Sequence, residues 1–199
     1  INQMLENMLS TETIVIITIL YIAGSIPFAV LSSVIFKLPD PRKHGSRNPG
    51  ATNVLRTGNK SAAVFTLFGD ALKGFIPMIY FMTSGFDTQQ LYLLSFSILI
   101  GHSYSIFLNF SGGKGVATSL GIIFALVPSV AALIVSVWLL VYYLFRVSGV
   151  SALIGFLLLP LFMYLVNGDS YMIMISFANV IFIYLTHKKN ILEFISNQT

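Results

Sequence analysis

Seven apolar runs fill most of this 199-residue chain, and they constrain its fold more than any other feature. A helix that crosses a bilayer needs roughly 20 apolar residues, or fewer where neighbouring helices shield it. Only 9% of the residues are charged, against roughly 25% in an ordinary soluble domain. We therefore predict an all-α, polytopic membrane protein of about seven transmembrane helices, folded as one domain over residues 1–199. The runs cover residues 13–36, 61–82, 89–107, 116–127, 129–145, 150–166 and 170–186.

The fourth and fifth runs could form one long helix, but Pro128 separates them. Proline lacks a backbone amide donor and disfavours helical geometry at the residue before it. We therefore expect two short spans that meet at Pro128. A count of five or six spans stays open if one of the pieces is re-entrant.

With seven spans, the acidic and the basic loop residues fall on opposite sides of the membrane. One side carries Glu6, Glu12, Asp87 and Asp169, with no Lys or Arg. By the positive-inside rule, the basic side faces the cytoplasm, so the N-terminus lies outside and the C-terminus is cytoplasmic. No basic segment or small-residue cleavage site precedes the first run, and we expect no removable signal peptide. The basic side carries Lys37, Arg42, Lys43, Arg47, Arg56, Lys60, Lys114, Arg146, Lys188 and Lys189.

Cysteine is absent, which excludes disulfide frameworks, thiolate metal sites and cysteine nucleophiles. The chain has only seven carboxylate side chains, so we expect no metal site and no cofactor. Catalysis would have to use oxygen or nitrogen groups.

The polar stretch from Lys37 to Lys60 has the composition of a phosphate site. Glycines let backbone amides converge on an anion, hydroxyl and amide side chains add donors, and arginine offers a planar fork to phosphate oxygens. The G-x-x-x-x-G-K-[ST] pattern of a P-loop is missing. A basic loop that meets anionic lipid headgroups is the alternative. The residues concerned are Gly45, Ser46, Asn48, Gly50, Thr52, Asn53, Arg56, Gly58 and Lys60.

A second glycine-rich element, FSGGKGVAT, precedes the fourth run. Its Gly112, Gly113 and Gly115 surround Lys114, and a helix is expected to begin directly afterwards. Amides at a helix N-terminus, with a lysine, predict a second anion site on the same side. A flexible turn with a snorkelling lysine is the alternative. Two such sites suggest two phosphorylated groups.

Asp70 and Lys73 lie inside the second apolar run, three residues apart and so on one helix face. Charges within a bilayer are costly and usually face the bundle interior in pairs. We expect these two to pair or to hold a loop cation, and both a structural and a catalytic role stay open.

Two histidines lie near the predicted anion sites. His102, at the end of the third run, is a candidate supporting residue, because a lone histidine is more often packed than catalytic. His187 begins the tail THKKNI, with Asn190 one helical turn later on the same face. Its position after the last span makes His187 a candidate catalytic residue.

Several separated motifs, in this order, resemble the bacterial acyl-phosphate-dependent glycerol-3-phosphate acyltransferases. They are GSIPF at 24–28, GSRNPGATNVLRTG at 45–58, DALKG at 70–74, GHSYSIFLNFSGGKGVAT at 101–118 and THKKNI at 186–191. The resemblance implies a seven-helix inner-membrane enzyme whose active site faces the cytoplasm. It would make 1-acyl-glycerol 3-phosphate from acyl phosphate and glycerol 3-phosphate, without direct use of acyl-CoA or acyl carrier protein.

The same resemblance assigns roles. It implies that Ser46, Arg56, Lys114 and His187, with Asn190, contact the substrate phosphates. Three positions depart from the family pattern: Arg47 stands at a common glycine, Ser105 at a common proline and Ser111 at a common lysine. Arg47 could compensate for the cation lost at Ser111. The remaining candidates shape or support the site: Gly45, Asn48, Gly50, Thr52, Asn53, Gly112, Gly113, Asp70, Lys73 and His102.

Acyl phosphate is already activated, so the reaction needs no covalent enzyme intermediate. The protein would hold the glycerol hydroxyl against the carbonyl carbon and stabilise the departing phosphate. Apolar helices would bury the acyl chain, at about 0.8 kcal/mol per methylene. The general base would be His187 or a substrate phosphate oxygen.

The expected partners are acyl phosphate, glycerol 3-phosphate, the lipid bilayer and an upstream enzyme that forms acyl phosphate, and we expect no nucleic acid. The alternative function is a transporter for a phosphorylated metabolite, since cationic loops and broken helices also serve anion translocation. Such a protein should place its key charges near the membrane midplane, whereas most charges here lie at one surface.

Overall fold

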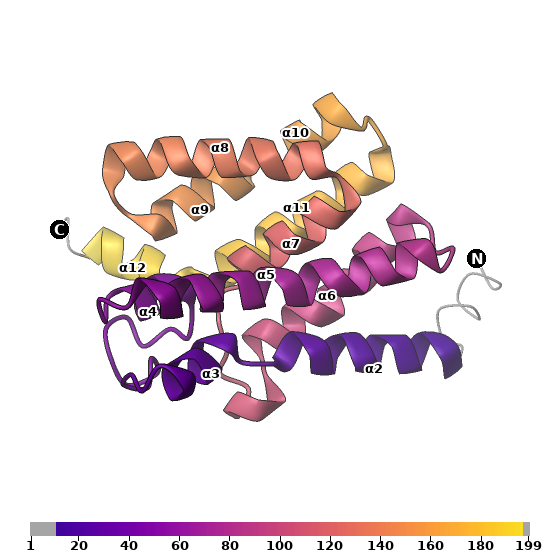
Figure 1. Ribbon diagram of the computed structural model, residues 1–199. Coiled ribbons are helices and arrows are strands. Elements are labelled where there is room, and N and C mark those ends of the chain that lie inside the picture. The colour runs from indigo at the N-terminus through magenta and orange to yellow at the C-terminus, as the bar shows by residue number, and fades with distance from the viewer. Residues whose placement is uncertain (1–10, 197–199) are drawn as a thin grey trace.

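The computed structural model describes residues 11–196, with side chains described as far as Leu192, and Glu6 lies outside this range. All regular structure in that part of the chain is helical (Figure 1), which confirms the predicted fold class. The helices are α2 (Thr11–Ser25), α3 (Phe28–Ile35), α4 (Ala51–Leu55), α5 (Lys60–Thr83), α6 (Thr88–Ser103), the 3-10 turn η1 (Ile106–Leu108), α7 (Val116–Leu126), α8 (Pro128–Phe145), α9 (Ser148–Leu157), α10 (Leu159–Val166), α11 (Ser170–Thr186) and α12 (Lys188–Ser196).

Prolines lie at three of the breaks between consecutive helices in the described chain, before α3 and in the first turns of α8 and α10. Pro128 is the first residue of α8, and Val127 before it has a non-helical backbone with φ −144° and ψ 79°. The predicted division at this point is therefore confirmed. Pro27 also breaks the first apolar run, between α2 and α3, because it adopts φ −93° and ψ 78°. The sixth run is divided into α9 and α10, which are bent by 42°.

Four helical segments are long and apolar enough to cross a membrane by themselves: Thr11–Ile35, Lys60–Thr83, Thr88–Leu108 and Pro128–Phe145. The bent pair α9 and α10 makes a fifth if it is one span. Two further apolar helices are shorter, α7 with 11 residues and α11 with 17. At 1.5 Å per residue, α7 extends only about 16 Å, about half the hydrocarbon thickness.

The surface of the bundle is apolar, as lipid requires. Large side chains such as Val34, Phe68 and Leu165 are exposed by 72%, 60% and 66%. Inside, glycines allow helices to pack closely, the usual means of association in membranes. A Cβ at Gly101 of α6 would come within 2.2 Å of Tyr21 O in α2, and one at Gly121 of α7 within 2.0 Å of Ala71 O in α5.

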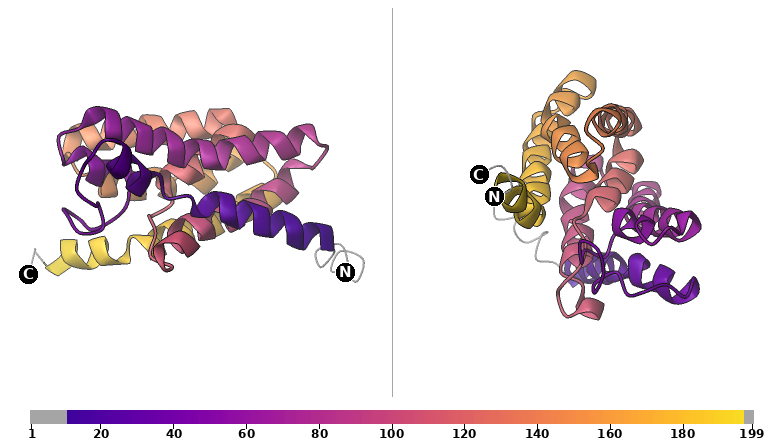
Figure 2. Two further views of the ribbon diagram at one scale, coloured as in Figure 1. Left: turned by 60° about the horizontal axis from the view of Figure 1, so that its bottom comes forward. Right: turned by 90° about the vertical axis from the view of Figure 1, so that its left-hand side faces the viewer.

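The helices run back and forth along one direction, so that their connections gather at two ends (Figures 1 and 2). The segment with α3 and α4, the α8–α9 turn and α12 lie at one end. The N-terminal end of α2 and the α5–α6 and α10–α11 turns lie at the other. The cations of 37–60 thus share an end with Arg146 and Lys188, while Asp87 and Asp169 cap helices at the opposite end.

Candidate active site

Asn53 organises the polar loop from within. This side chain, 5% exposed, donates from Nδ2 to Pro41 O at 2.8 Å and to His44 O at 3.0 Å. Its Oδ1 accepts from the amide of Ser46 at 3.0 Å. One amide side chain therefore ties three parts of the loop together, which fits a residue that shapes the site.

Gly45 and Arg47 turn the loop through the left-handed region, each with φ +58°. A Cβ at Gly45 would come within 2.2 Å of Asn53 Oδ1, so only glycine fits against this amide. Arg47 is exposed and adopts the left-handed conformation at the position where the family pattern has glycine. The backbone shape that glycine favours is therefore kept at a cost in strain.

The other loop candidates lie around this turn. Ser46 and Arg56 are exposed, and Arg56 lies beside Gly45, with its Cδ 3.6 Å from where a Cβ on that glycine would be. Thr52 Oγ1 lies 3.2 Å from Ser148 Oγ, a contact that joins the loop to the start of α9 and that the sequence did not indicate. Gly50 precedes α4 with an extended φ of −153°, and Asn48, partly buried, packs against it.

Arg42 has a local partner in this loop. Its guanidinium donates to Asp40 from Nε and from Nη2, the latter at 2.7 Å. These hydrogen bonds hold the pKa of Asp40 below its usual range. Arg42 therefore stabilises the loop. Arg56 is the arginine that lies beside Gly45.

The glycine turn packs against the end of α6. The amides of Gly112 and Gly113 donate to Ser103 O at 2.9 Å and to His102 O at 3.1 Å. These two amides thus have partners within the protein, so an anion site at this turn would draw on Lys114 and the first amides of α7. A Cβ at Gly113 would lie 2.2 Å from His102 Nε2 and 3.2 Å from Pro49 O. The two predicted anion sites therefore adjoin at Pro49 and Gly113, and the glycines serve close packing.

Lys114 is held by the tail. Its Nζ donates to Asn190 Oδ1, which brings two predicted site residues together. Thr186 Oγ1 donates to Lys114 O at 2.9 Å, a contact that sequence reasoning missed. Lys114 also lies just before the first turn of α7, where backbone amides have no partner within the helix. The cation and these amides are the groups of the turn whose chemistry suits an anion.

His187 is buried and neutral. It is 2% exposed, and its Nδ1 lies 2.8 Å from Ile183 O. Because a carbonyl only accepts, Nδ1 carries the proton and Nε2 keeps its lone pair. Burial lowers the pKa of His187 to about 4, and nearby Lys114 acts in the same direction. The ring can accept a hydrogen bond or a proton, but in this state it does not supply a positive charge to a phosphate.

Asp70, Lys73 and His102 form a buried network beneath both loops. Lys73 Nζ lies 2.8 Å from Asp70 Oδ1 and donates to Ile26 O at 2.9 Å. His102 Nδ1 lies 3.6 Å from the same carboxylate oxygen and 3.3 Å from Thr118 Oγ1. A small pocket lined by all three side chains reaches Pro49 and Gly113. Across residues 11–192, whose side chains the structure describes, no three His, Asp or Glu side chains gather as a metal site would require.

Ser105 fits the place of the family's proline. Its φ of −65° is the value that proline fixes, and its buried hydroxyl donates to Ser25 O at 2.6 Å. Ser111 is exposed beside the glycine turn, so its replacement of a lysine removes a cation from the rim of the site.

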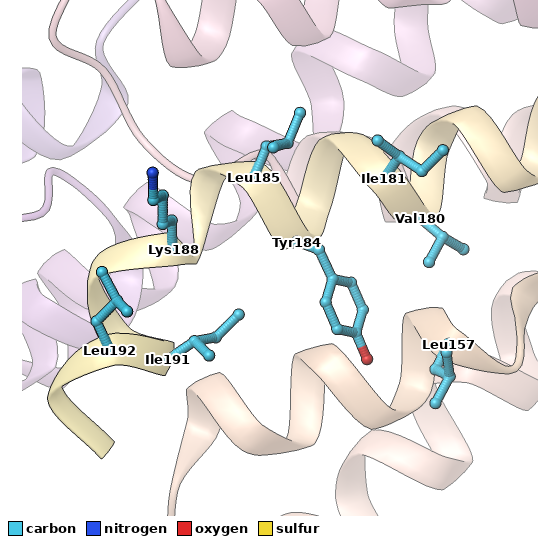
Figure 3. A pocket seen from close by; sticks show the side chains of 8 residues that line it. All are labelled: Leu157, Val180, Ile181, Tyr184, Leu185, Lys188, Ile191 and Leu192. Atoms are coloured by element: carbon cyan, nitrogen blue, oxygen red, sulfur yellow. The ribbon is translucent and has the colours of Figure 1, made fainter. Parts of the chain in front are cut away.

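An apolar groove of about 440 Å³ opens between α9 and the segment α11–α12 (Figure 3). In Figure 3 the ring of Tyr184 reaches towards α9, and its hydroxyl donates to Leu153 O at 3.2 Å. Ile191 lines the groove, and its chain neighbour Asn190 contacts Lys114. The groove thus shares helix α12 with the contact to Lys114. It is lined by Leu157, Val180, Ile181, Tyr184, Leu185, Lys188, Ile191 and Leu192.

Comparison with known proteins gives concordant results. The model of the family described as glycerol-3-phosphate acyltransferase matches residues 14–197. The glycerol-3-phosphate acyltransferase of Nitrosomonas europaea is 46% identical over 184 residues, which cover 90% of this chain and 92% of that protein. That of Cupriavidus metallidurans is 40% identical, covering 90% of this chain and 91% of its own length.

Two crystal structures of PlsY (YgiH), described as an integral membrane glycerol 3-phosphate acyltransferase, are similar throughout. The glycerol 3-phosphate form is 33% identical with a TM-score of 0.84, and the lysophosphatidic acid form is 32% identical with a TM-score of 0.85. Each comparison covers 94% of this chain and 93% of the other.

Proposed function

The chain belongs to the glycerol-3-phosphate acyltransferase family, as an integral membrane enzyme of phospholipid synthesis, and from this premise we propose that its acyl donor is acyl phosphate. The transfer would give 1-acyl-glycerol 3-phosphate and inorganic phosphate. Family membership disfavours the transporter alternative. An upstream enzyme that forms acyl phosphate would supply the donor.

The proposed topology has seven spans in one domain, residues 1–199, of a bacterial inner membrane. The seven would be α2 with α3, α5, α6, α7, α8, α9 with α10, and α11. Short α7 would be shielded on one side by α5, against which it packs through Gly121. The end with more Lys and Arg would face the cytoplasm, with the N-terminus outside, the C-terminus inside and the active site cytoplasmic.

The acyl donor would lie with its phosphate at Lys114 and its chain in the groove of Figure 3. The contact between Lys114 Nζ and Asn190 Oδ1, one residue before the groove residue Ile191, carries this proposal. An acyl phosphate needs one strong anion site beside one long apolar surface. Here α12 links the two, because Asn190 contacts Lys114 and the next residue, Ile191, lines the groove.

Glycerol 3-phosphate would bind to the polar loop. Arg56 offers a fork of donors to its phosphate, and Ser46 offers a hydroxyl, both exposed beside Gly45. Contact between Pro49 and Gly113 places this loop against the glycine turn. The two phosphates would therefore bind in neighbouring sites, with the acceptor hydroxyl near the donor carbonyl.

The reaction is a direct displacement. The 1-hydroxyl oxygen of glycerol 3-phosphate bonds to the acyl carbon, and the bond from that carbon to the phosphate oxygen breaks. Lys114 and the first amides of α7 would stabilise the negative charge that develops on the departing phosphate. The hydroxyl proton would go to His187 Nε2, which is unprotonated, or to a phosphate oxygen of a substrate.

Donor identity is tested with purified protein in detergent and radiolabelled glycerol 3-phosphate. Palmitoyl phosphate should support formation of labelled lysophosphatidic acid, whereas palmitoyl-CoA should not. Product formed from palmitoyl-CoA alone would contradict the proposed donor and leave the acyltransferase family assignment intact.

A further inference from the structure

The geometry points to a positioning role for the buried pair Asp70 and Lys73: through His102, the pair fixes the glycine turn that carries Lys114. This inference rests on the proposed function in one respect, that the donor phosphate binds at Lys114. The pair itself touches neither proposed substrate site.

One end of the network holds the broken first span. Lys73, 7% exposed, donates from Nζ to Ile26 O at 2.9 Å, and its ammonium lies 5.8 Å from the centre of the Phe28 ring. Ile26 and Pro27 form the break between α2 and α3, where helical hydrogen bonding is interrupted. The lysine therefore satisfies a carbonyl at the break and fixes where α3 departs towards the polar loop.

The other end of the network holds the glycine turn. Asp70 Oδ1 lies 2.8 Å from Lys73 Nζ and 3.6 Å from His102 Nδ1, on one edge of the imidazole ring. On the opposite edge, His102 Nε2 packs against Gly113 so closely that a Cβ there would come within 2.2 Å. The backbone of the turn adds the hydrogen bond from Gly113 N to His102 O, at 3.1 Å. A change in the ring's orientation would therefore displace Gly113, which directly precedes Lys114.

Stability alone is a poor explanation for this pair. The free energy that two charges lose when they leave water is barely offset by their mutual attraction. Replacing such a pair by apolar side chains of similar volume is therefore often neutral or stabilising. The contacts instead end at two backbone points that bound the active site, Ile26 O and Gly113. The pair is therefore placed to fix the positions of these two backbone points.

The test replaces the pair by apolar side chains of similar size, in the double variant Asp70→Leu/Lys73→Met, which leaves no unpaired charge. The KM for palmitoyl phosphate should rise about tenfold, while the KM for glycerol 3-phosphate stays within about twofold. Hydrogen exchange at the amides of Gly112 and Gly113, measured in detergent, should accelerate about tenfold, because the turn loses its support.

Thr66→Val is the matched control. Thr66 lies one turn earlier in α5, is fully buried, and donates its hydroxyl to Ala62 O at 2.9 Å. This variant removes a buried polar group from the same helix without touching the network, and both readouts should match the parent.

If the amide hydrogens of Gly112 and Gly113 exchange in the double variant at the same rates as in Thr66→Val, the positioning role is overturned. A double variant with lowered thermal stability and both KM values raised together would overturn it too, as the mark of a purely structural pair. A parent enzyme that does not use acyl phosphate would count against the proposed donor, and hydrogen exchange alone would then decide the positioning role.

Discussion

At the scale of single residues, the site combines one cation at a helix start with a neutral histidine. Lys114 has its position fixed by Asn190 and Thr186. His187 is held by Ile183 with its proton on Nδ1. Their proposed division of roles follows from burial: the partly buried lysine would supply charge, and the buried imidazole would supply a lone pair.

Acid should destabilise the protein through His187. Its pKa is about 4 when folded, below the ordinary 6.5, so between these values the unfolded chain binds a proton that the folded chain does not. The stability that neutral His187 contributes is therefore fully present above pH 6.5, and it is lost as the pH falls towards 4. Thermal unfolding in detergent at about pH 7.5 and about pH 5 should show a smaller drop in Tm for His187→Gln than for the parent. Equal drops would show that His187 does not titrate in this way.

Arg47→Gly should stabilise the protein. Relief of the left-handed strain at φ +58° outweighs the greater entropy of glycine in the unfolded chain, with a net gain of about 0.5 kcal/mol. The control is Lys43→Gly, an exposed cation of the same loop without positive φ, which should destabilise. A lower Tm for Arg47→Gly than for the parent would contradict the strain.

At the scale of elements, α11 and α12 connect the two halves of the proposed donor site. Between them lie His187 at the end of one helix and Asn190 in the first turn of the next. Their apolar faces form the groove with Leu157 of α9. The sequence was enough to propose His187 and Asn190 of this tail as site residues, whereas the groove depends on how three helices pack.

Filling the groove should change the acyl-chain preference. Leu157→Trp adds an indole at the wall opposite Val180 and Tyr184, so long chains lose space before short ones do. The ratio of kcat/KM for palmitoyl phosphate to that for octanoyl phosphate should fall about tenfold. Leu161→Trp, on an exposed position of α10 outside the groove, is the control. An unchanged ratio in Leu157→Trp would place the chain elsewhere.

At the scale of the whole molecule, the sequence predicts those features that depend on residues close together in the chain, such as helices and their breaks. All seven apolar runs are mainly helical, and the break at Pro128 was visible because proline acts on its own neighbour. The break at Pro27 was missed within an apparently continuous run. Contacts such as Lys73 with Ile26 and Lys114 with Asn190 join distant parts of the chain, so they follow only from the packed fold.

Arg47 also shows which features can be read from the sequence and which only from the structure. Its departure from the family's glycine was visible in the sequence, but its left-handed backbone was not. The close packing of Gly112 and Gly113 against His102 and Ser103 was likewise not visible in the sequence, since it joins the turn to the end of α6.

The proposed orientation can be tested by chemical labelling, because the chain has no natural cysteine. Cysteines placed at Lys43 and at Ser111, both exposed, should react with a membrane-impermeant maleimide in inside-out vesicles. Both should be protected in right-side-out vesicles. Labelling of the two positions from opposite sides would exclude a shared active site.

The central claim is that two adjoining anion sites each hold one phosphorylated substrate, and steady-state kinetics of Lys114→Met and Arg56→Met test it most directly. Each variant removes one cation and keeps an unbranched side chain in its place. Lys114→Met should raise the KM for palmitoyl phosphate at least about tenfold and change that for glycerol 3-phosphate by less than about threefold, and Arg56→Met should do the reverse. If both variants weaken the same substrate, or neither weakens either, the two-site account is wrong.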